Sequence, residues 1–185
     1  MKKYLKDYGI LFSIAGIIVA LDQWTKALVR QTIPTGGSWM PLEWLQPYAR
    51  IVHWYNRGAA FGLFQNGSLI FASLAVIVSI LIIYYFPQVP ARDWTMRLAM
   101  GMQLAGAVGN LIDRILQDGM VTDFISVGKF AVFNIADASI SVGVGILLLG
   151  AWFKERKQKR NKEENQKSEK GRADPSLEEN GIKSG

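Results

Sequence analysis

The chain has 185 residues, of which 50% are hydrophobic and 19% are charged, and its formal net charge is +6. Charged residues are few for a soluble protein, and the length allows one domain, so the composition favours a membrane protein. The absence of cysteine excludes disulfides and thiol catalysis, and the single histidine, His53, excludes zinc sites that need two histidines.

Four long apolar runs follow one another along the chain. They cover residues 8–29, 68–86, 98–116 and 133–153. A helix needs about 20 apolar residues to cross a bilayer. The run at 68–86 carries no charge, whereas the other three carry polar residues near one end. The sequence therefore predicts an all-α membrane protein with four transmembrane helices.

The first run begins like a cleaved signal peptide, because Lys2 and Lys3 precede an apolar core. However, the apolar pattern continues past Asp22 to Val29, and no convincing cleavage site with small residues precedes a soluble domain. We therefore expect this run to be an uncleaved transmembrane helix rather than a leader that is removed from the mature protein.

Basic residues in the segments between the runs predict the orientation of the chain. Short loops rich in Lys and Arg stay in the cytoplasm. Such residues precede the first run, lie between the second and third, and follow the fourth: Lys2, Lys3, Lys6, Arg92, Arg97, Lys154, Arg156, Lys157, Lys159, Arg160 and Lys162. We therefore expect both termini in the cytoplasm and the loops 30–67 and 117–132 on the outer side.

The loop 30–67 is expected to fold into a small extracytoplasmic region that contains β structure. Its stretch 50–55 is rich in β-branched and aromatic residues, which is typical of a strand. Several Trp and Tyr residues of the loop are types that prefer the lipid headgroup level. Residues 56–62 predict a turn of small residues where a backbone could approach a ligand. We expect His53 to lie on the surface of this loop or to pack within it, rather than to take part in chemistry.

The C-terminal segment 154–185 is polar and almost free of apolar residues. Such a composition cannot bury enough surface to fold, so we expect disorder from about Lys162. Its basic beginning would lie against anionic lipid headgroups, and we expect no binding of nucleic acid. The sequence thus predicts a transmembrane domain at 1–153 and a charged cytoplasmic tail at 154–185.

Polar residues interrupt three of the apolar runs at the same depth, near the outer face. Charged residues within membrane helices are costly, and they usually face the bundle interior or a water-filled cavity. Within each group the spacing of three or four residues places the side chains on one helix face. One polar pocket accounts for all of them, although single residues could instead reach the headgroups from helix ends. The groups are Asp22 and Lys26; Asn110, Asp113 and Arg114; and Asn134 and Asp137.

Two kinds of hydrolytic chemistry remain open for such a pocket. One is a serine activated by a lysine base; its candidates are Lys26, Lys129, Ser126, Ser139 and Ser141. The other is a pair of carboxyls that share a proton and activate water. Asp123 and Asp137 suit the second, because their neighbours are apolar and contain no cation.

Two other functional classes remain beside hydrolysis. A proton-coupled transporter or channel would also use carboxylates inside the membrane, and a lipid-binding scaffold is a further alternative. The uncharged run at 68–86 and the position of the polar residues at one face argue against a path across the membrane.

Five short motifs in this order resemble those of the lipoprotein signal peptidases, also called signal peptidase II. They are Asp-Gln-Trp-Thr-Lys at 22–26, Asn-Arg-Gly-Ala-Ala-Phe at 56–61, Gly-Asn-Leu-Ile-Asp-Arg at 109–114, Val-Thr-Asp-Phe at 121–124 and Phe-Asn-Ile-Ala-Asp at 133–137. The resemblance covers about residues 5–153 and leaves the charged tail outside.

This resemblance implies an aspartic endopeptidase of the bacterial cytoplasmic (inner) membrane, with its active site near the outer face. Such an enzyme removes the signal peptide from diacylglyceryl-modified prolipoproteins by cutting before the lipidated cysteine, and globomycin would inhibit it. The resemblance assigns Asp123 and Asp137 as the catalytic pair. It implies a functional monomer that contacts membrane lipids and needs no metal or other cofactor. Substrate-binding or supporting roles fall to Asp22, Lys26, Asn56, Asn110, Asp113, Arg114 and Asn134.

Overall fold

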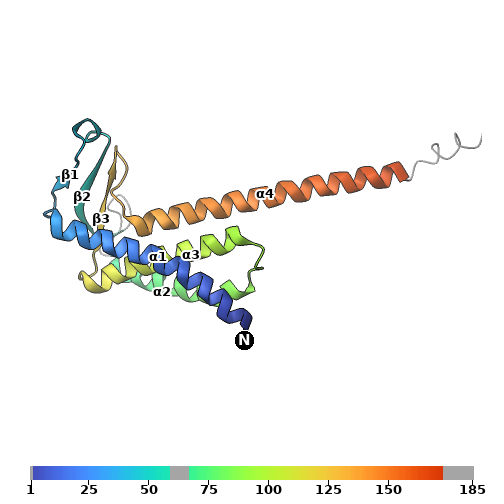
Figure 1. The fold of residues 1–185 in the computed structure, drawn as a ribbon, viewed down its shortest axis with the longest axis horizontal. Coiled ribbons are helices and arrows are strands. Elements are labelled where there is room, and N and C mark those ends of the chain that lie inside the picture. The colour runs from blue at the N-terminus through green and yellow to red at the C-terminus, as the bar shows by residue number, and fades with distance from the viewer. Residues whose placement is uncertain (1, 59–66, 173–185) are drawn as a thin grey trace, which may run out of the picture. The chain divides into compact units, whose positions relative to one another are not determined.

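The computed structural model describes residues 2–58 and 67–172. It is mostly helical, with one small sheet (Figure 1). The chain divides into two compact units, residues 1–147 and 148–185. The helices are α1 (Lys2–Thr32), α2 (Ser68–Tyr85), α3 (Trp94–Leu116) and α4 (Ile135–Arg172), with short 3-10 turns η1 (Glu43–Leu45) and η3 (Phe86–Gln88).

Three helices of the described chain are long and apolar enough to cross a membrane. These segments are Tyr4–Thr32, Ser68–Gln88 and Ile135–Lys162. Helix α3 is not among them, because its polar residues lower its hydropathy. The structure thus confirms a largely helical protein with membrane-spanning helices and a small sheet, while a fourth crossing remains a prediction.

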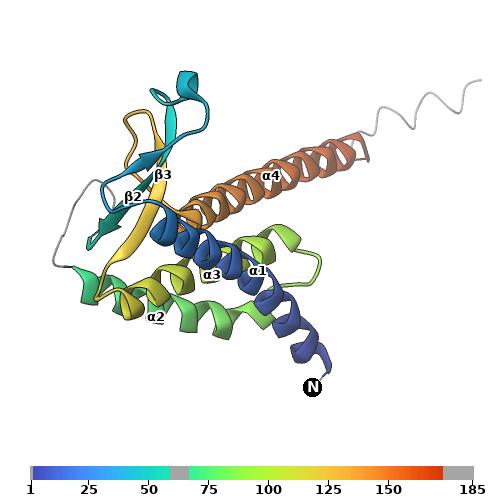
Figure 2. The same ribbon diagram turned by 60° about the vertical axis from the view of Figure 1, so that its left-hand side comes forward.

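Helix α3 packs against both α1 and α2 (Figure 2). Small residues allow the close approach to α1. A Cβ added at Gly101 would lie 2.7 Å from Ile14 Cγ2, and one added at Gly109 would lie 2.8 Å from Asp22 Oδ2. Larger residues at these positions would push the helices apart. The three helices share an apolar core made by Leu11, Ala15, Ile82, Phe86, Met100, Leu104 and Ala105.

A buried ion pair joins the beginnings of α1 and α3. Arg97 Nη2 donates to Asp7 Oδ1 at 2.6 Å, and both side chains are almost fully buried. The Arg97 guanidinium also lies 4.4 Å from the ring centroid of Phe86 and donates to the Val89 carbonyl at 3.2 Å. These contacts fix the end of the helix bundle that lies away from the sheet.

The sheet has three antiparallel strands in the order β1 (Ser38–Trp39), β2 (Ala49–Asn56) and β3 (Val121–Val127). The strand expected at 50–55 is therefore confirmed. Trp54 lies opposite Asp123, whereas Ile51 lies opposite Ile125. Because β2 advances three residues there while β3 advances two, β2 carries a bulge at this point.

After β3 the chain turns back and pairs with this strand, which places the start of α4 beside it. Phe133 exchanges backbone hydrogen bonds with Ile125, at 2.8 and 3.1 Å. The residue after Phe133 is Asn134, and α4 begins at Ile135, so the start of α4 lies beside β3. A second apolar cluster supports this junction, with Val29, Ile33 and Phe124 at its centre and Ile51, Ile125 and Ile135 around them.

His53 has a packing role, as the sequence led us to expect. Only 3% of it is exposed, and its Nδ1 lies 2.7 Å from the Ile33 carbonyl oxygen. Because that carbonyl can only accept, Nδ1 carries the hydrogen. His53 thereby ties β2 to the segment that follows α1.

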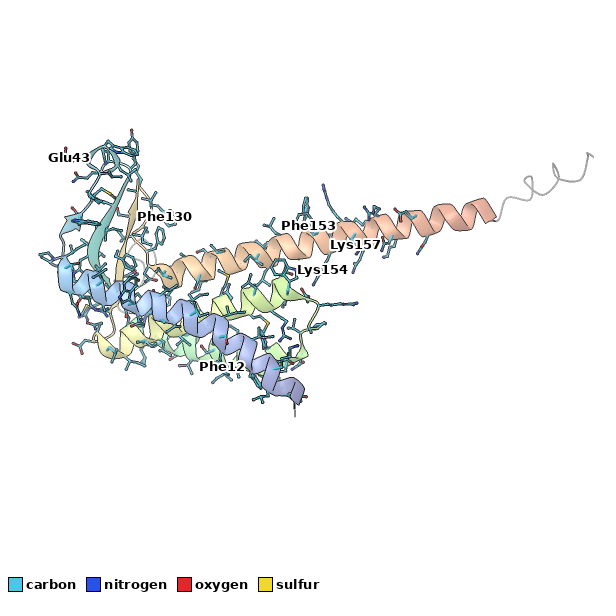
Figure 3. The ribbon with its side chains drawn as sticks, in the orientation of Figure 1. Phe12, Glu43, Phe130, Phe153, Lys154 and Lys157 are labelled. Atoms are coloured by element: carbon cyan, nitrogen blue, oxygen red, sulfur yellow. The ribbon has the colours of Figure 1, made fainter. Side chains whose placement is uncertain are left out.

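Helix α4 continues to Arg172, so the disorder expected from Lys162 is wrong for residues 162–172. Lys, Glu, Gln and Arg are good helix formers, which an argument from apolar content alone ignores. Ion pairs one turn apart add support: Lys159 Nζ lies 2.7 Å from Glu155 Oε1. Figure 3 shows Lys154 and Lys157 projecting from this helix. Residues 173–185 lie outside the described residues, and the domain boundary at 153 stays a prediction.

Candidate active site

The residues that the motifs single out meet where α1, α3, β3 and the start of α4 come together (Figures 1 and 2). They come from the C-terminal third of α1, the last two turns of α3, the end of β2, the first half of β3, and the first turn of α4 with the residue before it. One connected network of hydrogen bonds and ion pairs includes all nine: Asp22, Lys26, Asn56, Asn110, Asp113, Arg114, Asp123, Asn134 and Asp137.

Asn134 and Asp137 form a reciprocal cap at the start of α4. Asn134 Oδ1 accepts from the Asp137 backbone N at 2.9 Å, and Asp137 Oδ2 accepts from the Asn134 backbone N at 3.2 Å. This is the geometry of a capping box, in which residues three apart satisfy each other's free backbone donors. The spacing in Asn-Ile-Ala-Asp therefore fixes the carboxyl of Asp137 at the helix end.

Asn134 also reaches the second carboxyl. Its Nδ2 donates to Asp123 Oδ1 at 2.7 Å, so a single side chain joins Asp123 to the cap of Asp137. Asn56 Nδ2 donates to the other carboxyl oxygen of Asp123 at 3.2 Å, while Asn56 Oδ1 accepts from the Gly58 backbone N. Amide groups thus hold both oxygens of Asp123.

The environment of Asp123 favours its protonated form. The residue is only 2% exposed. Burial, and next the charge of Asp137, raise the pKa of Asp123 to about 7, against the opposing effect of hydrogen bonds from Asn56 and Asn134. Two carboxyls that interact in this way suit the sharing of one proton.

Asn110 connects Lys26 to Asp137 through hydrogen bonds of its side-chain amide. Asn110 Oδ1 accepts from Lys26 Nζ at 3.1 Å and from Asn134 Nδ2 at 3.1 Å. Because an ammonium group can only donate, the Asn110 oxygen must face Lys26 and its NH₂ must face the other way. That NH₂ donates to Asp137 Oδ1 at 2.7 Å. Lys26 therefore orients Asp137 through one intervening amide.

A buried ion cluster lies behind the two central aspartates. Lys26 Nζ lies 2.8 Å from Asp22 Oδ2 and 3.4 Å from Asp113 Oδ2. Each carboxylate also accepts a backbone N–H from the residue just before a central aspartate. Asp22 Oδ1 accepts from Ala136 N at 2.9 Å, and Asp113 Oδ2 accepts from Thr122 N at 2.8 Å. The two supporting carboxylates thus fix the backbone next to Asp137 and Asp123.

Arg114 borders this network. Its Nη1 donates to the Asn110 carbonyl at 3.3 Å, and its guanidinium lies 5.5 Å from the ring centroid of Phe71 on α2. Its Nε is buried and makes no hydrogen bond within the described part of the chain. Arg114 thus places a positive charge near both central aspartates.

Comparison with known proteins decides the family. Residues 14–153 match the family described as Signal peptidase (SPase) II. The chain belongs to this family. A lipoprotein signal peptidase of Halalkalibacterium halodurans is 39% identical over 157 residues, which cover 83% of this chain and 98% of that protein. One of Staphylococcus aureus is 36% identical over 166 residues, covering 88% of this chain and 98% of that protein.

Solved structures of bacterial membrane enzymes share the fold of this chain. A bacterial membrane enzyme determined at 2.3 Å resolution superposes with a TM-score of 0.73 at 32% identity and covers 82% of this chain and 92% of its own. A second, determined at 1.9 Å resolution, gives a TM-score of 0.68 at the same identity. The shared fold therefore extends over most of the chain.

The serine–lysine alternative does not fit the geometry of this candidate site. Lys26 Nζ contacts three acceptors, in Asp22, Asp113 and Asn110, and none of these contacts is with a serine hydroxyl. Ser139 Oγ and Ser141 Oγ donate to backbone carbonyls.

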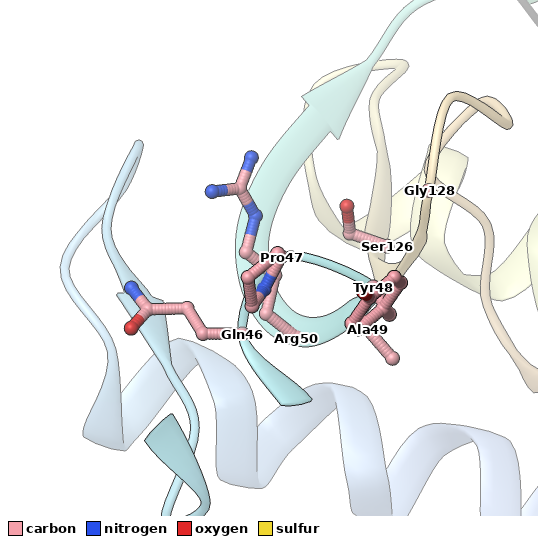
Figure 4. A pocket seen from close by; sticks show the side chains of 7 residues that line it. All are labelled: Gln46, Pro47, Tyr48, Ala49, Arg50, Ser126 and Gly128. Atoms are coloured by element: carbon pink, nitrogen blue, oxygen red, sulfur yellow. The ribbon is translucent and has the colours of Figure 1, made fainter. Parts of the chain in front are cut away.

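Ser126 lines a small hollow further along β3. The hollow has a volume of about 110 Å³ and is bordered by Pro47, Tyr48 and Arg50, among others (Figure 4). Its lining contains neither a carboxylate nor a lysine that could activate the serine. The hollow is therefore separate from the chemistry of the two aspartates. Among the described residues, no group of three or more His, Cys, Asp or Glu side chains could hold a metal ion.

Sequence reasoning missed three residues that contact this network. Gln23 Nε2 donates to Asp22 Oδ2, to the Gly109 carbonyl and to Asp113 Oδ1. Arg30 on α1 donates a hydrogen bond to the hydroxyl of Thr122 on β3. Gln23 lies inside a motif and could have been found there, whereas Arg30 resembled an ordinary basic residue at a helix end. Residues 59–61 of the second motif lie outside the described residues.

Proposed function

We propose that this chain removes the signal peptide from diacylglyceryl-modified prolipoproteins, as a membrane aspartic endopeptidase whose catalytic pair is Asp123 and Asp137. One observation carries the proposal: in a chain of the signal peptidase II family, Asn134 holds Asp123 at 2.7 Å and caps α4 together with Asp137. The arrangement joins a buried carboxyl, Asp123, to a partly buried one, Asp137, from a separate element, as the sharing of one proton requires.

The pair would act by general acid–base catalysis. Asp123 holds the shared proton near neutral pH, because burial raises its pKa to about 7. The ionised Asp137 takes a proton from water, which attacks the carbonyl carbon of the scissile bond. Asp123 gives its proton to the carbonyl oxygen, and the tetrahedral intermediate collapses when the leaving nitrogen is protonated.

The supporting residues keep the two carboxyls in place during this reaction. Lys26 and Asn110 orient Asp137, and Asp113 holds the strand that carries Asp123. Arg114 supplies a positive charge beside the anion that develops on the substrate. General acid–base steps contribute about a hundred- to ten-thousand-fold each, so the loss of this order should be costly.

We propose that α3 is the fourth transmembrane helix. Its 23 residues would span about 35 Å, against about 30 Å for the hydrocarbon core. Its polar side chains Arg97, Asn110 and Asp113 are buried inside the bundle. The surface that α3 offers to lipid is therefore apolar even though its overall hydropathy is moderate.

With four crossings, both termini lie in the cytoplasm and the sheet lies outside. Support comes from the basic segments at 2–6, 92–97 and 154–162, which then share one side. The candidate catalytic pair falls at the outer boundary, where water reaches the peptide bond while the lipid of the substrate stays in the bilayer. A functional monomer, which the family resemblance implies, remains a prediction.

A transporter is the weaker alternative. Among the described residues, the buried pair of Asp7 and Arg97 and the outer network are separated by an apolar core that includes Leu11, Phe86 and Leu104. The test of the proposal is cleavage of a lipidated prolipoprotein by the purified protein in detergent. Product that starts at the lipidated cysteine supports it, and an intact substrate after prolonged incubation contradicts it.

A further inference from the structure

A second cation, Arg30, lies beside the buried ion cluster of Lys26, Asp22 and Asp113. Arg30 follows Lys26 by one turn of α1, so the two side chains leave the same face. Its Nη1 donates to Thr122 Oγ1 at 2.9 Å and lies 3.6 Å from Asp113 Oδ1. Its side chain is 20% exposed. Arg30 belongs to none of the five motifs, so the resemblance assigns it no role.

Thr122 connects Arg30 to the catalytic pair. It directly precedes Asp123 on β3, at the point where the end of α1 lies beside this strand (Figure 2). Neighbouring residues of a strand point to opposite faces, so Arg30 contacts the face of β3 that is turned away from the carboxyl of Asp123. Asp113 holds the backbone N of the same threonine at 2.8 Å. The ion pair of Arg30 and Asp113 therefore contacts Thr122 at two atoms, its Oγ1 and its backbone N.

Arg30 also balances the charge behind the pair. The cluster contains two carboxylates, Asp22 and Asp113, and Lys26 alone neutralises only one of them. Arg30 supplies the second positive charge. A buried carboxylate that loses its cation becomes strongly unfavourable. Without Arg30, the layer behind Asp123 would carry one excess negative charge.

We propose that Arg30 is a positioning residue for the peptidase reaction, which orients Asp123 by holding Thr122 and neutralises Asp113. The inference rests on the proposed function. Its contacts within the described chain run to Thr122 and Asp113, and it acts on the reaction through them.

Three variants separate the hydrogen bond from the charge: Thr122→Val, Arg30→Met and Arg30→Lys. The measurements are kcat and KM for cleavage of a lipidated prolipoprotein as a function of pH, and the thermal unfolding midpoint in detergent. Thr122→Val should lower kcat about tenfold, the value of one hydrogen bond to a charged group, with unchanged KM and an unchanged pH profile.

Arg30→Met should lower kcat at least as much and also move the alkaline limb of the profile. The charges that act on Asp123 come from Lys26 on α1, Arg114 on α3 and Asp137 on α4, and Asp22 and Asp113 are paired with Lys26. The strand β2, which pairs with β3, carries Arg50 and His53. An excess negative charge among these groups holds the shared proton more tightly, so the limb should rise by about 0.5 pH unit. Arg30→Lys should return the limb to the wild-type position.

The double variant should be no slower than Arg30→Met, because the two changes remove the same hydrogen bond. Arg50→Met serves as the matched control, since Arg50 is an exposed basic residue of β2, and it should leave kcat and the profile unchanged. A wild-type kcat in Arg30→Met and Thr122→Val, or a rise in KM alone, would overturn the inference.

A purely structural role would overturn it as well. In that case the loss of kcat would disappear when each variant is assayed far below its unfolding midpoint. Failure of the proposed function has a different signature, because the wild-type protein itself would then leave the lipidated substrate intact. An active wild type with unaffected Arg30 variants rejects only the role of Arg30.

Discussion

Replacing Asn134 tests how the two aspartates are held together. Asn134→Ala removes the cap on the Asp137 backbone N, the 2.7 Å hydrogen bond to Asp123 and the contact with Asn110. Loss of a cap costs about 1 kcal/mol of stability. Loss of a hydrogen bond to a charged group costs about 1.5–3 kcal/mol. We expect a lower unfolding midpoint together with a fall in kcat of about a hundredfold.

Asn134→Ser separates the two effects. Serine is a good helix cap, so its hydroxyl can still accept from the Asp137 backbone N. Its side chain is too short to span the distance to Asp123. The unfolding midpoint should therefore stay near that of the wild type while kcat falls as far as in Asn134→Ala. A serine variant with wild-type kcat would refute the idea that Asn134 positions the catalytic pair.

Three further predictions concern pH, the C-terminal helix and the substrate lipid. The pKa of Asp123 is raised from 3.8 to about 7, so its proton stabilises the fold fully below pH 3.8 and this contribution is lost as pH rises through 7. Because the reaction needs this proton, kcat should fall about tenfold per pH unit above pH 7. A flat profile of kcat to pH 9 would contradict this prediction. Deleting the residues after Lys162 should leave turnover within about twofold, because this segment lies outside the matched family region and its described side chains are exposed, and a truncated protein that inserts normally but does not cleave would show otherwise. Cleavage should require the diacylglyceryl group, and equal rates for modified and unmodified prolipoprotein in detergent would refute that requirement.

The sequence predicts much of the site because polar residues stand out within apolar runs. Asp22, Asn110 and Asp137 each interrupt such a run at the end that is expected to lie near the outer face, and helical spacing places their partners on the same helix face. The strand at β2 was also predictable from its β-branched and aromatic residues. These local patterns needed no knowledge of tertiary contacts.

Contacts between distant segments could not be predicted in this way. Asn134 reaches Asp123 only because Phe133 pairs with Ile125, and no local pattern indicates that pairing. The same holds for the ion pair of Asp7 with Arg97 and for the contact of Arg30 with Thr122, which join residues about 90 positions apart. The helix beyond Lys162 was missed for another reason, because apolar content carries no information on helix propensity.

The most direct test of the account compares Asp123→Asn and Asp137→Asn with the wild type in cleavage of a lipidated prolipoprotein. Asparagine preserves the size of the side chain but can neither act as a general base nor exchange the shared proton. Each variant should insert and unfold almost like the wild type while kcat falls about a thousandfold or more, and the double variant should be hardly slower, because the two residues act as a unit. Near wild-type turnover by either correctly inserted variant would contradict the assignment of the catalytic pair.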